Sequence, residues 1–315
     1  MKLLLYRDDG LGDTLFTIPT VNFILNFIPN VELYWITNHA ELTQNIMNHR
    51  NLYVFTPLQI RKVEDTIFDV ALFLGPWGKI KSLKHLQDIL SVKSRYKSIS
   101  SYEKKLTYKI LKFFLPKNYF WIDFENIFIG HDILNTWSFT VYTLQKLSIS
   151  FVRCSEEEIF RMYDYRLYCD NLSKVKDRKK VIVHFTYKSL YLGVGFKDYY
   201  RLIDFLKSFG DVVVIFGPYE KKYMDPFSYN VEKMFVSSIK KYVDLCFESF
   251  LLVGFDTGPV HLACFFNVPY VVSFFPDKGF SYRVTRWKPF SNISKTLVMK
   301  YSDLDYISGL EKFLR

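Results

Sequence analysis

The sequence predicts an α/β protein with two doubly wound domains, each a parallel sheet covered by helices. Short apolar runs of strand length alternate with longer amphipathic runs, which is typical of β-α-β units. Such a series occurs twice, beginning near Leu3 and again at Val181. The chain has 315 residues, which is enough for two domains with separate hydrophobic cores.

The first series begins with a strand at residues 3–6 and a glycine-containing loop at residues 7–13. A helix is predicted over residues 14–28 because this stretch is rich in apolar residues. Pro19 is expected to break or bend it, since proline cannot donate the hydrogen bond that a helix interior requires. The next strand is expected at residues 31–36.

The second series supplies the rest of the predicted architecture. Its strands are expected at residues 181–184, 212–216, 251–254 and 268–275, and its helices at residues 198–208 and 238–247. The polar and charged segment 170–180 suits a linker between the two series. Ligands of such folds bind beyond the carboxyl ends of the strands, so the function is expected in the loops there.

One of these loops carries the most informative motif of the chain, Asp256-Thr257-Gly258-Pro259-Val260-His261-Leu262-Ala263. Gly258 lets backbone N–H groups approach a ligand, and Pro259 suits the first helical position, where no intrahelical donor is lost. A helix that starts directly after a strand presents its N-terminal N–H groups to an anion. The motif therefore predicts a strand, a ligand-facing turn, a helix and a further strand.

Composition excludes several classes of protein. No apolar run approaches the roughly 18 residues that span a bilayer, and the apolar start is too short for a signal peptide, so a cytosolic protein is expected. No paired spacing that would suggest a zinc site or a disulfide framework is found among Cys154, Cys169, Cys246 and Cys264. We therefore expect reduced thiols and no metal.

The formal net charge of +10 is concentrated in one segment, since eleven basic residues stand against two acidic ones between Lys79 and Lys117. Such a block is either a solvated face or a footprint for an anionic partner, such as a nucleic acid, an acidic membrane surface or a phosphorylated glycan. No nucleic-acid-binding motif is visible, so no nucleic-acid partner is expected.

The two loops together resemble glycosyltransferase family 9, the bacterial heptosyltransferases that build the lipopolysaccharide inner core. The resemblance rests on Leu11-Gly12-Asp13 near the N-terminus and on the eight-residue motif near the C-terminus. It implies a GT-B architecture, with two Rossmann-like doubly wound domains facing a central cleft. Residues 1–169 would bind the acceptor and residues 170–300 the nucleotide sugar, with a C-terminal helix at residues 301–315 packing back onto the first domain. Such enzymes are inverting and metal-independent.

The resemblance also assigns roles to single residues. Asp13 matches the general base that takes the proton of the acceptor hydroxyl, although it can also be a helix cap, and Asp8 and Asp9 are nearby competitors. Glu220 matches an acidic residue that binds ribose; the alternative is a solvated charge.

The eight-residue motif would hold the rest of the donor. Gly258 and the helix from Pro259 would stabilise the departing diphosphate. Thr257 would add a hydroxyl, and Asp256 would accept hydrogen bonds from sugar hydroxyls. His261 would donate to the ligand or act as a structural partner of the helix end.

The chain departs from the family pattern after the strand that ends near His184. Tyr191 stands near the position where a lysine is expected, and the Trp-Pro pair that usually follows is missing. Thr186 keeps a hydroxyl for a phosphate group. Lys188 or Lys197 can supply the missing positive charge, because a lysine acts as a point charge that tolerates a change of position.

The resemblance thus predicts the transfer of heptose from ADP-heptose to a lipopolysaccharide inner-core acceptor, with no cofactor besides the donor. The acceptor would be an anionic glycolipid at the inner membrane surface, contacted by Gly12, Lys79, Lys81, Lys84 and Arg95. We expect a cytoplasmic monomer that can bind the inner membrane face peripherally. The alternatives are another nucleotide sugar as donor, or a catalytically inactive protein that binds a glycolipid or polyanion. A nicotinamide-dependent dehydrogenase is disfavoured because Leu15 occupies the third glycine position of the G-x-G-x-x-G pattern.

Overall fold

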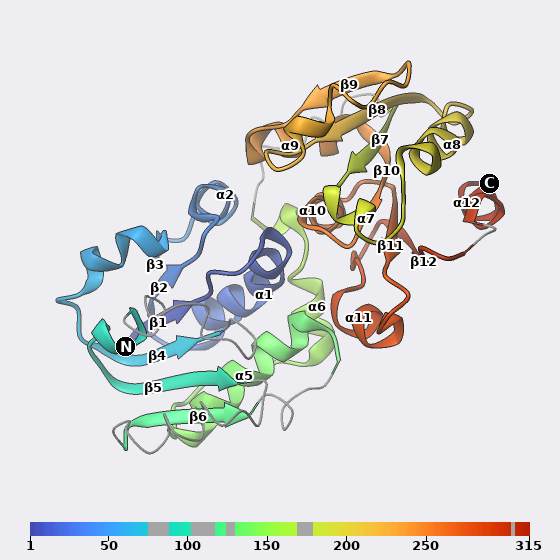
Figure 1. Cartoon of the computed structure of the whole chain (residues 1–315). Helices are drawn as coiled ribbons and strands as arrows, with labels where there is room; N and C mark the ends of the chain where they lie inside the picture. The colour runs from blue at the N-terminus through green and yellow to red at the C-terminus, as the bar shows by residue number, and fades with distance from the viewer. Residues whose placement is uncertain (75–87, 102–116, 124–129, 169–178, 304–305) are drawn as a thin grey trace. The chain divides into compact units, whose positions relative to one another are not determined.

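The computed structural model describes residues 1–74, 88–101, 117–123, 130–168, 179–303 and 306–315 (Figure 1). The chain divides into two compact units, Met1–Tyr163 and Asp164–Arg315. Lys79, Lys81 and Lys84 lie outside the described residues, as does most of the expected linker. Each unit is taken by itself below.

The first unit contains a six-stranded sheet with the order β3-β2-β1-β4-β5-β6, in which all neighbouring strands are parallel (Figure 1). Leu3, Leu4 and Leu5 of the central strand are fully buried, because helices cover both faces of a sheet of this kind. The strands are β1 (Lys2–Tyr6), β2 (Glu32–Ile36), β3 (Leu52–Phe55), β4 (Phe68–Phe73), β5 (Ser94–Ser101) and β6 (Tyr119–Asp123).

The helices of the first unit are α1 (Leu11–Phe27), α2 (Ala40–Ile46), the 3-10 segment η1 (Pro57–Val63), α5 (Asp132–Lys146) and α6 (Glu156–Arg161). α1 packs against α5. Of the two effects expected of Pro19, a break in α1 does not occur, because the helix runs through Pro19 without interruption; a bend stays a prediction. All residues from position 14 to 21 are buried, and this packing compensates for the lost backbone hydrogen bond.

The second unit contains another six-stranded parallel sheet, with the order β12-β11-β10-β7-β8-β9. The four strands predicted from the second series are found as β7, β8, β10 and β11. The bounds are β7 (Lys180–Phe185), β8 (Asp211–Phe216), β9 (Glu232–Phe235), β10 (Ser249–Phe255), β11 (Tyr270–Phe275) and β12 (Lys295–Lys300).

The helical segments of the second unit are η3 (Tyr165–Leu167), α7 (Tyr187–Leu190), α8 (Phe196–Leu206), η5 (Lys221–Tyr223), α9 (Ile239–Glu248), α10 (Gly258–Phe265), α11 (Phe280–Trp287) and α12 (Tyr306–Leu314). The C-terminal helix α12 packs within the second unit. Leu310 is fully buried in the core of the second unit, and the rings of Phe313 and Tyr270 lie 5.6 Å apart. The apolar face of α12 thus covers the sheet that β11 and β12 belong to.

In each sheet, the strand that comes first in the chain has later strands on both sides, which makes it a topological switch point. β1 lies between β2 and β4, and β7 lies between β8 and β10. Ligands of doubly wound sheets bind at such a switch point, beyond the carboxyl ends of the strands. The loop after β1 and the loops after β7 and β10 occupy these positions. Within the described part of the chain, no helix is long and apolar enough to cross a membrane.

Candidate functional site

The loop after β1 leads into α1, and Asp13 lies in the first turn of this helix. Its Oδ2 accepts a hydrogen bond from the backbone N–H of Gly10 at 3.2 Å. A carboxylate here is favoured by the positive end of the helix dipole. Asp13 therefore acts as a cap, as one interpretation expected, and this hydrogen bond also fixes the carboxylate in one orientation.

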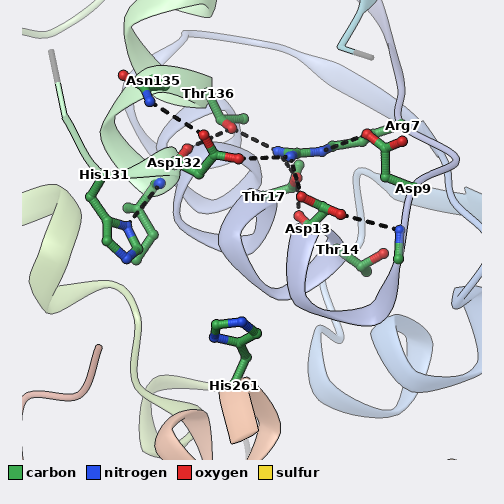
Figure 2. Close-up of polar contacts among 12 residues, drawn as sticks. Arg7, Asp9, Asp13, Thr14, Thr17, His131, Asp132, Asn135, Thr136 and His261 are labelled. Carbon is green, nitrogen blue, oxygen red and sulfur yellow. Dashed lines mark hydrogen bonds and ion pairs between the residues drawn. The ribbon is translucent and has the colours of Figure 1, made fainter. Parts of the chain in front are cut away.

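The second carboxylate oxygen of Asp13 contacts Arg7, the residue that follows β1. The Arg7 side chain is fully buried, and its Nη2 lies 3.0 Å from Oδ1 of Asp13 and 3.5 Å from Oδ2 of Asp132. Its Nε lies 3.6 Å from Oδ2 of Asp9. Nη1 donates to the hydroxyls of Thr17 and Thr136 at 3.1 and 2.7 Å. Figure 2 shows the guanidinium among these groups, which we call the Arg7 cluster.

The three carboxylates of the Arg7 cluster differ in accessibility. The side chain of Asp132 is fully buried and that of Asp9 is 7% exposed, whereas that of Asp13 is 26% exposed. The buried guanidinium thus has three carboxylate neighbours, of which two are buried and one is partly exposed. Asp13 is thus the member of the cluster that a substrate can reach most easily.

Asp132 is a member that sequence reasoning missed. It begins α5 and lies 125 residues after Arg7 in the chain, so no local pattern links the two. The N-cap residue His131 fixes the start of α5, since its Nδ1 accepts from the N–H of Ile133 at 3.2 Å. Arg7 is recognisable in the sequence because it is a charged residue directly after the apolar run Leu3–Tyr6. Its partners could not be inferred from this position.

The predicted acceptor-binding residues in the described segments, Gly12 and Arg95, lie on different elements. Gly12 lies in the first turn of α1 beside Asp13. Arg95 lies on β5 and forms an exposed ion pair with Asp69 at 3.4 Å. Lys97, from the same basic segment, is only 3% exposed and donates to the carbonyl of Ile89 at 2.8 Å. Burial lowers the pKa of Lys97 to about 8. Lys97 therefore supports the fold and is no part of a charged surface.

In the second unit, the eight-residue motif forms the predicted strand, turn, helix and strand. α10 begins at Gly258, with Thr257 as its N-cap residue and Pro259 in its first turn. Gly254 on β10 lets this helix approach the sheet, because a Cβ atom there would lie 2.9 Å from Cγ2 of Val260. The sequence thus encodes both the helix start and its close packing on the strand.

A histidine that sequence reasoning gave no role holds the turn in place. The hydroxyl of Thr257 donates to the carbonyl of Phe255 at 3.0 Å, which leaves its oxygen to accept from Nδ1 of His184 at 3.2 Å. Burial, and secondarily the charge of Lys188, lowers the pKa of His184 to about 3, so the imidazole is neutral. Its only signal in the sequence is its position as a polar residue near the end of the apolar strand β7.

The other polar residues of the motif pair with each other. Nε2 of His261 lies 3.6 Å from Oδ1 of Asp256, which precedes the N-cap residue of α10. His261 is 4% exposed, whereas Asp256 is half-buried. His261 therefore lies beside the carboxylate of Asp256, and its role toward a ligand or the helix end stays a prediction.

Thr186 and Glu220, both predicted on the donor side, lie together beyond β7 and β8. The Thr186 hydroxyl donates to Oε1 of Glu220 at 3.5 Å, and the two residues are 2% and 6% exposed. Burial raises the pKa of Glu220 above its ordinary value. Gly217 makes room for this carboxylate, because a Cβ there would lie 2.8 Å from Oε2. The alternative that Glu220 is a solvated charge is therefore wrong.

A pocket of about 560 Å³ opens at the carboxyl ends of β10, β11 and β12, and we call it the α10–α11 pocket. Three predicted donor-side residues, Lys188, Asp256 and Thr257, line it. Thr186, Lys197, Glu220 and His261 do not. The remaining walls include residues that sequence reasoning missed, among them Lys278, Gly279, Tyr282, Arg283 and Trp287. No group of three His, Cys, Asp or Glu residues within the described segments is arranged to hold a metal ion.

No protein-family model matches the sequence, and no curated protein matches it either. Solved structures do match over the whole chain. A glycosyltransferase family 9 protein from Veillonella parvula is 13% identical, with a TM-score of 0.63, and the match covers 99% of this chain and 89% of that one. The E. coli heptosyltransferase WaaC with ADP is 16% identical, with a TM-score of 0.64 and coverage of 100% and 99%. The E. coli ADP-heptose lps heptosyltransferase II is 14% identical, with a TM-score of 0.66 and coverage of 100% and 98%.

These likenesses establish the fold class. The chain is an α/β protein with two parallel six-stranded sheets and has the GT-B type of fold found in the heptosyltransferase structures. The fold that the two sequence motifs predict is therefore confirmed. More particularly, it is the fold of the glycosyltransferase family 9 structure over 99% of the chain.

Proposed function

We propose that the protein is an inverting glycosyltransferase that uses a nucleotide diphosphate sugar as donor and Asp13 as general base. The observation that carries the proposal is the Arg7 cluster. It presents one partly exposed, oriented carboxylate at the switch point of a doubly wound sheet. A partly exposed carboxylate that a buried guanidinium holds in one orientation suits a base that accepts a proton from a sugar hydroxyl.

The reaction requires one displacement at the anomeric carbon of the donor. The acceptor oxygen forms the new bond to this carbon while the bond to the diphosphate oxygen breaks, and the electron pair leaves with the diphosphate. The proton of the acceptor hydroxyl passes to Oδ1 or Oδ2 of Asp13. Because attack comes from the face opposite the leaving group, the configuration at the anomeric carbon inverts.

We assign donor binding to the second unit. Asp256, which lies beside His261, accepts hydrogen bonds from sugar hydroxyls, and Thr257 and the N-terminus of α10 face the leaving group. Thr186 and Glu220 bind the ribose or the adjoining phosphate. Cationic side chains of the α10–α11 pocket, rather than a metal ion, neutralise the diphosphate.

For the substrates, we propose heptose transfer from ADP-heptose to an anionic lipopolysaccharide inner-core acceptor. Two structures with the same fold contain ADP and ADP-2-deoxy-2-fluoro heptose, which supports an ADP-linked donor. Gly12 beside the base, together with Arg95, Lys79, Lys81 and Lys84, would contact the acceptor.

The test is turnover of ADP-heptose with a core acceptor by the wild-type protein and by Asp13→Asn. Loss of a general base lowers turnover by about 10²–10⁴-fold. Asp9→Asn is the matched control, because Asp9 contacts the same guanidinium but is buried, and its effect on turnover should be much smaller. Unchanged turnover of Asp13→Asn would show that Asp13 is not the base.

A second function is favoured by the segment after β7, where Tyr191 is 77% exposed near the position expected for a lysine. This alternative is a protein that binds a glycolipid or polyanion without catalysis. Thermal unfolding with ADP, UDP and GDP separates the two, since a donor nucleotide at a hundred times its Kd stabilises the protein by about 2.7 kcal/mol. Salt-sensitive binding to anionic vesicles, with no stabilisation by any nucleotide, would favour the second function.

A further inference from the structure

The α10–α11 pocket carries an excess of positive charge. Its charged lining consists of Lys188, Lys278 and Arg283 against the single carboxylate of Asp256. Oδ1 of Asp256 lies 3.6 Å from Nε2 of His261. Among the residues that the structure describes, none of the three cations has a carboxylate within ion-pair distance. A cavity that is lined by three cations without protein counterions is suited to a ligand with more than one negative charge.

Two helices also begin at this pocket. Thr257 is the N-cap residue of α10 and Gly279 that of α11, and both line the cavity. Neither residue caps its helix with a side-chain hydrogen bond. Gly279 has φ of 72°, a left-handed conformation that favours glycine and brings the chain directly into α11. The backbone N–H groups of two helix ends thus add to the charge of the side chains.

From these observations we propose that the loop between β11 and α11 supplies diphosphate-binding residues, with Arg283 and Lys278 acting together with Lys188. This inference rests on the proposed use of a nucleotide diphosphate sugar. It explains how the chain manages without the lysine that the family pattern places after β7, since Lys197, the other candidate, does not line the pocket. A sugar-linked diphosphate carries two negative charges, which matches the excess of cations over carboxylates.

The neighbouring arginine of α11 shows why Arg283 is the ligand-binding one. Arg286 is 2% exposed, lies 4.4 Å above the ring of Trp287 and donates to the hydroxyl of Tyr282 at 2.7 Å. Arg286 therefore holds two aromatic residues of the pocket wall in place. Arg283, one turn earlier, is half-buried and lines the cavity. Its planar guanidinium can bind two phosphate oxygens at once.

The inference is tested by calorimetric titration of the full chain with three pairs of probes: adenosine and ADP, uridine and UDP, and guanosine and GDP. We expect Arg283→Gln to weaken the binding of the preferred nucleoside diphosphate by about ten- to hundredfold, because a charge-assisted hydrogen bond is lost. The affinity for the nucleoside should not change. Lys278→Ala should cause a smaller loss, and Arg283→Lys should retain part of the affinity.

Arg201→Ala and Lys240→Ala are matched controls, because these residues belong to the same unit but do not line the pocket. Circular dichroism and the melting temperature verify that each variant folds. Inorganic pyrophosphate is the second probe: it should stabilise the wild-type protein against heat and not Arg283→Gln. If the wild type binds a nucleoside diphosphate and Arg283→Gln binds it and pyrophosphate equally well, this inference is wrong and the proposed function stands. If the wild type binds no nucleotide, the proposed function fails as well.

Discussion

The two units have the same kind of sheet but carry opposite charge in the sites beyond the carboxyl ends of their strands. In the first unit, one buried arginine follows the central strand and is surrounded by three carboxylates. In the second unit, three cations and one carboxylate line a pocket at the strand ends. The comparison teaches that a doubly wound sheet provides the location of a site, whereas the side chains of its loops decide the chemistry. In the proposed reaction, the first unit accepts a proton and the second holds the diphosphate.

We expect the stability of the first unit to depend on Arg7 more strongly than the stability of the second unit depends on the cations of its pocket. Arg7→Met tests this expectation. The substitution leaves Asp132 buried without its counterion, and breaking a buried ion pair in this way costs about 3–5 kcal/mol of the free energy of unfolding. Denaturant unfolding measures the loss. Adding Asp132→Asn to Arg7→Met should recover part of it, because the uncompensated charge is then gone. A loss below about 1 kcal/mol would show that the Arg7 cluster does not hold α1 and α5 together.

In the second unit, the buried titratable group near the motif is His184, which is neutral. Its effect on stability is measured by lowering the pH. The unfolded chain binds a proton below the ordinary pKa of about 6.5, whereas the folded protein does so only near a pKa of about 3. The free energy of unfolding therefore falls as the pH falls through this window, by about 1.4 kcal/mol per pH unit. His184→Asn removes the titrating group while keeping a side-chain amide near Thr257. Its stability should depend less steeply on pH, and curves parallel to those of the wild type would contradict the assignment.

Glu220 is expected to have the smallest effect on stability, and its effect has the opposite dependence on pH. Burial raises its pKa in the folded state, so its contribution to stability is full at low pH and is lost as the pH rises through the raised value. Glu220→Gln cannot ionise and should therefore gain stability relative to the wild type as the pH increases. Unfolding curves at several pH values between 4 and 8, expressed as the difference between the two proteins, are the measurement. A difference that shrinks with increasing pH would contradict the burial of this carboxylate.

Most of the fold was predictable from apolar periodicity. The strands predicted at 3–6 and 212–216 and the helix predicted at 238–247 are found within a residue or two of those positions. The continuity of α1 has a tertiary cause, since the buried surroundings of Pro19 outweigh its helix-breaking tendency.

The candidate site was predictable in part. Asp13 and the motif from Asp256 to His261 stand out because each follows a strand and opens a helix, a pattern written in consecutive residues. Glu220 lies near Thr186, another residue predicted on the donor side, but the sequence did not predict their contact. The roles of these residues in binding and catalysis remain predictions that the experiments above address.

The sequence by itself determined the alternation of strands and helices, the two turns that each join a strand to a helix, and the position of the candidate base, since these depend on neighbouring residues and their local backbone preferences. Only the tertiary structure decided which side chains share a site. Asp132 reaches Arg7, His184 reaches Thr257, and Arg283 lines the same pocket as Lys188. Each of these pairs joins separate elements. Their proximity follows from strand order, sheet register and helix packing, which no local pattern encodes.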